Sequence, residues 1–153
     1  MTSKKIYLIA QNIRSLYNVG SLFRSADVFN IDKIYLTGYT GAPPREQISK
    51  VALGAENWIS FESVRHTHLL IPKLKRDGVH IYALETGKKT TDISKFKPKF
   101  PCALIIGNEV KGITKKILDL SDQVLQIPLS GKKDSLNVSV AAGIALYELN
   151  RHR

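Results

Sequence analysis

The chain has 153 residues, a length that fits one domain over 1–153 and leaves no room for a second. Its longest apolar runs fall far short of the roughly 20 residues that a membrane-spanning helix needs. Lys and Arg number 23 against 13 Asp and Glu, so the net charge is +10. Such a surplus attracts polyanions, and nucleic acid is therefore the first class of partner that we expect.

The amino terminus and the cysteine content indicate the compartment. The first apolar run, residues 6–10, has only the length of a strand and cannot serve as the core of a secretory leader. The single cysteine, Cys102, excludes an intrachain disulfide and stands in an apolar run, where we expect a small buried side chain. We therefore expect a cytoplasmic protein.

Short apolar or β-branched runs alternate with helical patterns along the chain. In chain order the sequence predicts a strand at 6–10, a helix at 19–29, a strand at 33–37, a helix at about 69–77, strands at 79–84 and 103–106, a helix at 114–120, a strand at 124–127 and a helix at 136–150. This alternation predicts an α/β domain with a largely parallel sheet.

Details of two helices refine the prediction. Apolar residues of the first helix recur at helical spacing, and they leave Arg24 and Asp27 off the apolar side. These apolar residues are Val19, Leu22, Phe23 and Ala26. Gly78 is suited to end the helix at about 69–77, whereas Pro72 either interrupts that helix or marks its true start.

Two loops are long enough to have a function, one at 38–46 and one at 86–101. The second loop is strongly basic, with Asp92 as its one acid, and is either a solvated connector or a rim that contacts phosphates. Its lysines are Lys88, Lys89, Lys95, Lys97 and Lys99.

Several common signatures are absent, among them G-x-G-x-x-G, the P-loop and G-x-S-x-G. A Rossmann dinucleotide site and a P-loop are therefore disfavoured. His66 and His68 have no Cys or acidic cluster beside them, so we interpret them as surface or helix-start residues and expect no metal site. His80 opens a predicted strand and is interpreted as structural.

Polar and glycine-bearing residues gather in three segments at strand or helix ends, where α/β proteins place ligands. The first, 18–26, contains Asn18, a natural N-cap, and Arg24, which could simply pair with Asp27 three residues on. The second, 106–113, combines Gly107, which allows a close backbone approach, with Glu109 in a loop.

The third segment covers 127–131 and 135–142. It places three short polar side chains, Ser135, Asn137 and Ser139, at the start of the last helix. Ser135 or Asn137 could cap that helix, which explains one of the three. A cluster of this kind at a helix start often binds a ligand.

Taken together and in this order, the three segments resemble the signature motifs of the SpoU/TrmH family of RNA 2′-O-methyltransferases, in the SPOUT superfamily. The resemblance covers nearly the whole chain, and the stretch Ser-Leu-Asn-Val-Ser-Val-Ala-Ala at 135–142 is its most specific part. It implies a parallel-sheet α/β fold whose carboxyl-terminal segment forms a deep trefoil knot, an exception to the usual connection rules.

The resemblance also implies a cofactor, S-adenosyl-L-methionine, held in a bent form by the knotted loops. Backbone groups at strand ends would bind the adenine edge and apolar side chains would cover its faces. The matching positions are Leu84, Gly107, Ile127, Leu129, Ser135 and Leu136. A side chain at position 107 would block the cofactor.

The residues matched to the catalytic positions of the family are Arg24, Asn18, Glu109, Ser135 and Asn137. Arg24 and Asn18 would act on the acceptor ribose, while the others shape the site. Because a guanidinium remains protonated at physiological pH, we interpret Arg24 as a group that orients the ribose-phosphate and helps the hydroxyl to lose its proton, rather than as a simple general base.

Members of the family are dimers through the knotted region, with the acceptor site at or near the interface, and many carry an additional amino-terminal RNA-binding domain. We expect a homodimer without that domain, because the chain begins almost directly at the first strand. RNA capture would then depend on basic residues near the site. The candidates are Arg14, Arg24, Lys88, Lys89, Lys132 and Lys133.

The acceptor is the least determined feature. We expect tRNA, with rRNA as an alternative, and a base nitrogen as a less favoured acceptor than the ribose. A non-catalytic RNA-binding protein of the same fold is the competing interpretation, and the intact motif residues argue against it. The net charge of +10 and the missing phosphate-loop motifs argue against a small-molecule enzyme.

Overall fold

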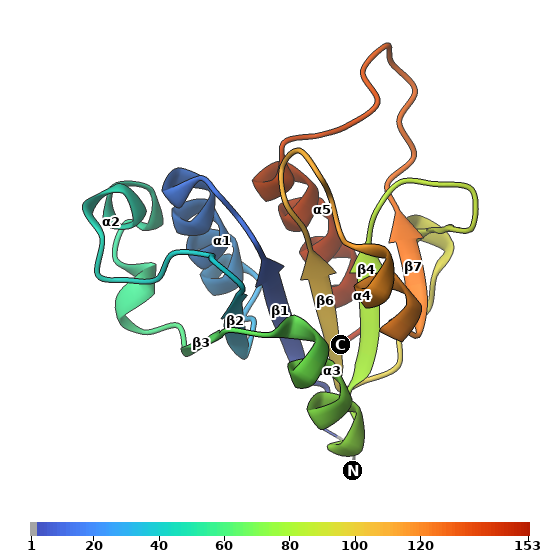
Figure 1. Ribbon diagram of the computed structural model, residues 1–153, viewed down its shortest axis with the longest axis horizontal. Helices are drawn as coiled ribbons and strands as arrows, with labels where there is room; N and C mark the ends of the chain where they lie inside the picture. The colour runs from blue at the N-terminus through green and yellow to red at the C-terminus, as the bar shows by residue number, and fades with distance from the viewer. Residues whose placement is uncertain (1–2) are drawn as a thin grey trace.

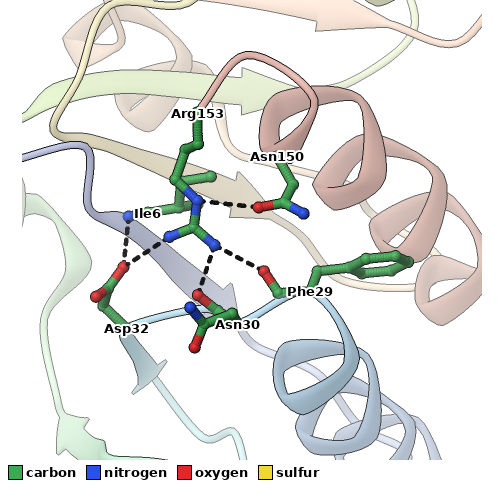
Figure 2. Close-up of polar contacts among 6 residues, drawn as sticks. All are labelled: Ile6, Phe29, Asn30, Asp32, Asn150 and Arg153. Atoms are coloured by element: carbon green, nitrogen blue, oxygen red, sulfur yellow. Dashed lines mark hydrogen bonds and ion pairs between the residues drawn. The ribbon is translucent and has the colours of Figure 1, made fainter.

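The computed structural model describes residues 3–153 (Figure 1). Helices and strands alternate along the chain, with two short 3₁₀ helices, η1 and η2, among them. In chain order the elements are β1 (Ile6–Gln11), α1 (Leu16–Val28), β2 (Lys33–Thr37), α2 (Glu46–Ala52), η1 (Ala55–Asn57), β3 (Phe61–Val64), α3 (Thr67–Arg76), β4 (His80–Leu84), β5 (Thr91–Asp92), η2 (Ile93–Lys95), β6 (Cys102–Ile106), α4 (Lys115–Leu120), β7 (Gln123–Gln126) and α5 (Val138–Asn150).

The strands form one seven-stranded sheet in the order β3-β2-β1-β6-β4-β7-β5, and every pairing is parallel. The predicted α/β domain with a largely parallel sheet is confirmed. The strands β2 and β3 extend the sheet on one side of β1. The later strands β4 to β7 all lie on the other side of β1. The order therefore reverses between β1 and β6. In open parallel sheets, the crevice beyond the carboxyl ends of the strands at such a reversal is the usual ligand site.

Helices cover both faces of the sheet, because the side chains of each strand alternate between them. In β1, Ile6 and Leu8 belong to a core shared with α1, α2 and α5, whereas Ile9 packs in a second core with α3 and α4. The helices α3 and α4 lie in front of the sheet in Figure 1, and α5 lies behind β4 and β6. The result is a three-layer sandwich.

All the predicted strands and helices are present; the strand at 33–37 has the predicted bounds, and the others have shifted ends. The main error is at α1, which begins at Leu16 and is capped by Ser15, so the prediction of Asn18 as N-cap is wrong. Ser15 has the extended backbone that a cap requires, and its hydroxyl accepts a hydrogen bond from the Asn18 N–H at 3.2 Å. The Asn18 side chain is thereby free for other contacts.

The helix α3 begins at Thr67, and Pro72 lies in its interior, so Pro72 does not mark the start. Gly78 follows the end of this helix with φ +83°, as the sequence predicts for a residue in the left-handed region. His80 opens β4, also as predicted.

Five elements have no counterpart in the sequence prediction: α2, η1, β3, β5 and η2. Both unpredicted strands lie at the edges of the sheet, where a continuous apolar run is not needed. In β3 the middle residues Glu62 and Ser63 are exposed, and β5 has only two residues.

Cys102 is fully buried in β6, as expected, and burial raises the pKa of its thiol to about 12. Among residues 3–153, no helix combines the length and the apolar character needed to cross a bilayer.

Candidate active site

A cavity of about 500 Å³ lies beyond the carboxyl ends of β4, β6 and β7. Three loops enclose it, one after each of these strands, and the first residues of α5 complete the wall. Figure 1 shows the three loops rising from the same edge of the sheet. The volume lies in the range typical of small-molecule and cofactor sites.

All six residues that the resemblance assigns to the cofactor line this one cavity, although they come from three separate parts of the chain. They are Leu84, Gly107, Ile127, Leu129, Ser135 and Leu136. Glu85 and Asn108 also line the cavity and were not predicted as site residues. Both hold the surrounding loops in shape through hydrogen bonds to backbone groups, a role without a sequence pattern of its own.

Asn108 organises the loop after β6. Its side-chain oxygen accepts hydrogen bonds from the N–H groups of Val110 at 2.9 Å and Lys111 at 2.8 Å. Its side-chain nitrogen donates to the Asn12 carbonyl at 2.9 Å and to the Tyr39 hydroxyl at 2.7 Å. Because the residue is only 9% exposed, these bonds replace water almost completely and fix the loop to the end of β1.

Gly107 is needed by the loop itself. A Cβ at this position would lie 2.7 Å from the Gly112 carbonyl carbon and from the Ile113 nitrogen, far inside van der Waals contact. The sequence interpretation was that a side chain here would block the cofactor. The first obstacles within the chain are the Ile113 side chain at 2.6 Å and backbone atoms of residues 112–113, which fold back onto position 107. The interpretation that a side chain here would also block the cofactor stays a prediction.

Glu85 joins two of the enclosing loops. One of its carboxylate oxygens accepts a hydrogen bond from the Ile113 N–H at 2.9 Å, and the other accepts from the Thr86 N–H at 3.0 Å. The loops after β4 and β6 therefore form one hydrogen-bonded wall of the cavity.

The loop after β7 differs from that wall. Residues 129–136 are exposed, and they make no hydrogen bond to the rest of the described chain, residues 3–153. A Cβ at Gly131 would meet no atom within 4 Å. Leu129, Ser135 and Leu136 nevertheless line the cavity from this loop.

Glu109 lies between the cavity and the start of α1. Its two carboxylate oxygens accept hydrogen bonds from the N–H groups of Arg14 at 3.0 Å and Ser15 at 2.9 Å, and from the Asn18 side chain at 3.2 Å. Partial burial raises the pKa of this carboxyl, but the hydrogen bonds outweigh it and lower the pKa below its ordinary value. Glu109 is therefore a carboxylate at neutral pH.

Asn137 extends this chain of contacts. It is the N-cap of α5, as one of two sequence alternatives proposed, and its side-chain oxygen accepts from the Ser139 N–H at 2.9 Å. Its side-chain nitrogen donates to the Asn18 oxygen at 3.4 Å. Residues 18, 109 and 137, which come from the three predicted segments, thus form one continuous hydrogen-bonded chain.

Arg24 stands apart from the other predicted catalytic residues. It lines a second hollow of about 350 Å³ between α1 and α5, together with Ser21 and Val140. It lies six residues after Asn18 on α1, about 9 Å further along the helix axis. The alternative pairing with Asp27 is wrong, because the Asp27 carboxylate accepts a hydrogen bond from the Trp58 indole at 2.7 Å and has no ion pair with Arg24.

The other predicted RNA-contacting cations are all exposed and lie on loops at the carboxyl edge of the sheet. They are Arg14, Lys88, Lys89, Lys132 and Lys133. The basic loop at 86–101 is more ordered than a plain connector, since it contains β5 and η2.

His66 occupies the residue before α3, the helix-start position expected for it, and its ring centroid lies 5.4 Å from that of His68. Within residues 3–153 no group of three or more His, Cys, Asp or Glu side chains is placed to hold a metal ion.

These features define a class of protein: a parallel sheet covered on both faces, with a cavity of the size of a small-molecule site beyond the carboxyl ends of its strands. The model of the SpoU rRNA Methylase family matches residues 5–147, and the chain belongs to this family.

Two curated relatives and one solved structure illustrate the similarity. The tRNA (guanosine(18)-2′-O)-methyltransferase of Aquifex aeolicus is 29% identical over 98% of this chain and 71% of its own length. The 23S rRNA (guanosine-2′-O-)-methyltransferase RlmB of Vibrio parahaemolyticus is 30% identical over 97% of this chain and 60% of its own length. The AdoMet-bound rRNA methyltransferase structure from Sinorhizobium meliloti, at 27% identity, superposes with a TM-score of 0.91 over 97% of this chain and 56% of that one. Several relatives are thus considerably longer than the part that the chain spans.

Proposed function

We propose that the chain is an S-adenosyl-L-methionine-dependent RNA methyltransferase that methylates a ribose 2′-hydroxyl, with tRNA as the favoured acceptor. Family membership supports the reaction, and the Aquifex relative, a tRNA methyltransferase, supports tRNA as the acceptor. The Vibrio relative supports rRNA as the second candidate. An RNA substrate of either kind is consistent with a cytoplasmic location. The single observation that carries the proposal is the convergence of six family cofactor positions on one cavity.

The cavity fits the chemistry of the methyl donor. Apolar side chains from separate loops, including Leu84, Ile127 and Leu136, are suited to cover the faces of an adenine ring. Backbone groups at the strand ends are suited to bind its polar edge. The bound donor supplies an electrophilic methyl group on a sulfonium, so the protein has to provide mainly positioning and exclusion of water.

The hydrogen-bonded chain of residues 18, 109 and 137 borders the cavity on the side of α1. Since Glu109 is held by backbone groups of the β1–α1 connection, it fixes Asn18 relative to the cavity wall. We assign these residues and Ser135 to shaping the acceptor site. In the transfer, the 2′-oxygen would form its new bond to the methyl carbon as the carbon–sulfur bond of the donor breaks, and the hydroxyl proton would leave to water or to a phosphate oxygen.

We assign Arg24 to orienting the ribose-phosphate, a task for which a planar, permanently charged guanidinium is suited. Because Arg24 lines a hollow separate from the cofactor cavity, we propose that a second copy of the chain completes the acceptor site. This agrees with the homodimer through the knotted region that the resemblance implies.

The surface of α5 supports such a dimer. An exposed apolar stripe follows one side of this helix at helical spacing, as expected for a face that packs against another protein. Its residues, with their exposed fractions, are Val140 (51%), Ile144 (39%) and Tyr147 (52%). Val140 also lines the hollow that contains Arg24.

The trefoil knot remains part of the proposal and follows from the family. The path of the chain is compatible with it: after β7 the chain runs through the long loop 127–137 and returns behind β4 and β6 as α5, which contacts α1 and η2 (Figure 1). Among the exposed cations, we propose that Arg14, Lys88, Lys89, Lys132 and Lys133 contact the phosphates of the RNA near the site.

Transfer of a labelled methyl group tests the proposal. The purified chain is incubated with labelled S-adenosyl-L-methionine and either total tRNA or total rRNA, and the products are digested and mapped as nucleosides. We expect a 2′-O-methylated nucleoside from tRNA. The variant Arg24→Ala should lose at least about 100-fold in transfer and keep donor binding, because positioning contributes strongly to such reactions. Turnover of this variant at the wild-type rate would refute the role of Arg24, and a methylated base would refute the ribose as acceptor.

A further inference from the structure

Cations gather on the front face of the molecule, at the start of α3 and around α4. The segments 63–72 and 110–118 form this region and contain no Asp or Glu. The two helices pack against each other, which brings the two segments together. We define the α3–α4 cationic surface by five residues: Arg65, His66, His68, Lys111 and Lys116.

The charges of this surface are available to a partner. Arg65, His66, Lys111 and Lys116 are exposed, and none of them forms an ion pair within residues 3–153. By contrast, Lys75 and Lys115 on the same helices pair with Asp122 and Asp119 and are not included.

The positive charge of α4 acts on a side chain at the start of α3. Partial burial of the His68 ring, followed by the positive charge of Lys116 and the neighbouring His66, lowers the pKa of His68. A lowered pKa favours the neutral form of His68, so the positive charge of this surface comes mainly from Arg65, Lys111 and Lys116. Neighbouring positive charges repel one another in the free protein, and a bound polyanion relieves this repulsion.

The α3–α4 cationic surface is continuous with the cofactor cavity. Lys111 lines the cavity from the loop after β6, and Lys116 follows five residues later on α4. Arg65 directly follows β3, whose last residue pairs with Thr37 at the carboxyl end of β2. The surface therefore runs from the mouth of the cavity along the carboxyl edge of the sheet to the front face.

We propose that the α3–α4 cationic surface binds the phosphate backbone of the substrate RNA in the segment that flanks the methylated nucleotide. This inference rests on the proposed function, since it assumes that RNA enters the cavity region. The hollow that contains Arg24 lies between α1 and α5 on the other face of the sheet, so the flanking RNA would pass over the carboxyl edge of the sheet to reach the α3–α4 cationic surface. The paired rings of His66 and His68 add planes on which an unpaired base can stack.

Charge reversal at two residues tests the surface. The variant Arg65→Glu/Lys116→Glu changes two exposed residues that line neither cavity. The matched control, Lys5→Glu/Arg76→Glu, makes the same change in net charge at exposed residues next to the amino ends of β1 and β4, on the opposite edge of the sheet. The probe is labelled, unmodified tRNA transcript, and its affinity is measured by fluorescence anisotropy over a range of salt concentrations.

We expect the test variant to bind tRNA at least about tenfold more weakly, with a log–log salt slope smaller by about two. The control should lose at most about twofold. Donor affinity, measured by calorimetry, and methyl transfer at saturating tRNA should remain near wild type, because neither residue belongs to the catalytic or cofactor site. If donor binding is lost, Arg65→Gln/Lys116→Gln replaces the test variant, with an expected slope change in the same direction.

The inference would be overturned if the test variant and the control lost equal affinity for tRNA, or if the test variant kept wild-type affinity. An acidic protein would then be the partner to test for this surface. Failure of the proposed function is a different outcome. In that case the wild-type chain transfers no methyl group to any RNA, whether or not the α3–α4 cationic surface binds tRNA.

Discussion

Two loops line the same cavity in opposite ways. The loop after β6, residues 107–113, is fixed by the buried Asn108 side chain and by the Glu85 carboxylate. The loop after β7, residues 129–136, is exposed and makes no hydrogen bond to the other described residues. One wall of the cavity is thus formed before any ligand arrives, and the other has little that holds it in place.

The two loops should contribute differently to the free energy of ligand binding. A preformed wall requires no ordering when the ligand binds, whereas a loosely held loop must lose conformational entropy at that moment. The second loop also carries the apolar side chains Leu129 and Leu136, so its ordering over a ligand would close the cavity. Stability and ligand affinity should therefore respond differently to changes in the two loops.

The largest expected effect comes from a matched pair of glycines. Gly107→Ala forces a Cβ against backbone atoms at 2.7 Å, and it should lower the free energy of unfolding by about 2–3 kcal/mol and abolish donor binding. Gly131→Ala meets nothing within 4 Å and should change that free energy by less than about 0.5 kcal/mol. Urea denaturation of both variants measures the difference, and equal losses would remove the distinction between the loops.

A smaller loss of stability is expected for Asn108→Ala. The change removes the nearly buried side chain that accepts from the N–H groups of Val110 and Lys111 and donates to the Asn12 carbonyl and the Tyr39 hydroxyl. We expect the free energy of unfolding to fall by about 2 kcal/mol, close to the desolvation cost of such groups. The same denaturation experiment applies, with Asn57→Ala in η1 as a control that removes no hydrogen bond of the site. An unchanged midpoint would mean that Asn108 does not fix this loop.

Leu129→Ala should show the opposite pattern. Because this side chain is 37% exposed and its loop makes no hydrogen bond to the other described residues, the free energy of unfolding should change by less than about 0.5 kcal/mol. Burial of a leucine against a ligand contributes about 1.5 kcal/mol, so donor affinity should fall by roughly tenfold. Calorimetric titration with S-adenosyl-L-methionine measures this loss, and full affinity would contradict closure of the loop over the donor.

The smallest expected effect is the pH dependence of the stability that Glu109, in the loop after β6, provides. The pKa of Glu109 is lowered in the folded chain, so its contribution to stability is present above the ordinary carboxyl pKa and is lost as the pH falls through the folded value. Against Glu109→Gln, the wild type should be more stable by about 0.5–1 kcal/mol at pH 7, a typical value for an acid at a helix start. This advantage should vanish in acid. Denaturation at pH 7 and pH 3 measures it, and an advantage that persists at pH 3 would contradict a charge effect.

The sequence predicts the central strands of the sheet better than its edge strands. Residues 6–10 and 103–106 read as strands because both faces of the central strands are buried, which requires continuous apolar runs. The edge strands β3 and β5 have no such requirement and were missed. Pro72 in the middle of α3 was ambiguous, because only the tertiary structure determines on which side of a proline a helix continues.

The candidate site divides in the same way. Residues 18, 109 and 137 could be chosen from motifs, and they meet through hydrogen bonds between three loops. The supporting roles of Glu85 and Asn108 could not be predicted from motifs. In a single sequence, polar residues near strand ends look the same whether or not they support a site. The position of Arg24 in a separate hollow depends on the rotation of α1, which motif spacing does not reveal.

Hydrogen exchange with and without S-adenosyl-L-methionine tests the central claim most directly. We predict that the amides of residues 107–113 exchange slowly in both states, and that those of residues 129–136 exchange rapidly in the free chain and become protected when the donor binds. Unchanged exchange in residues 129–136 at saturating donor concentration would contradict a donor site between one rigid loop and one that closes over the ligand.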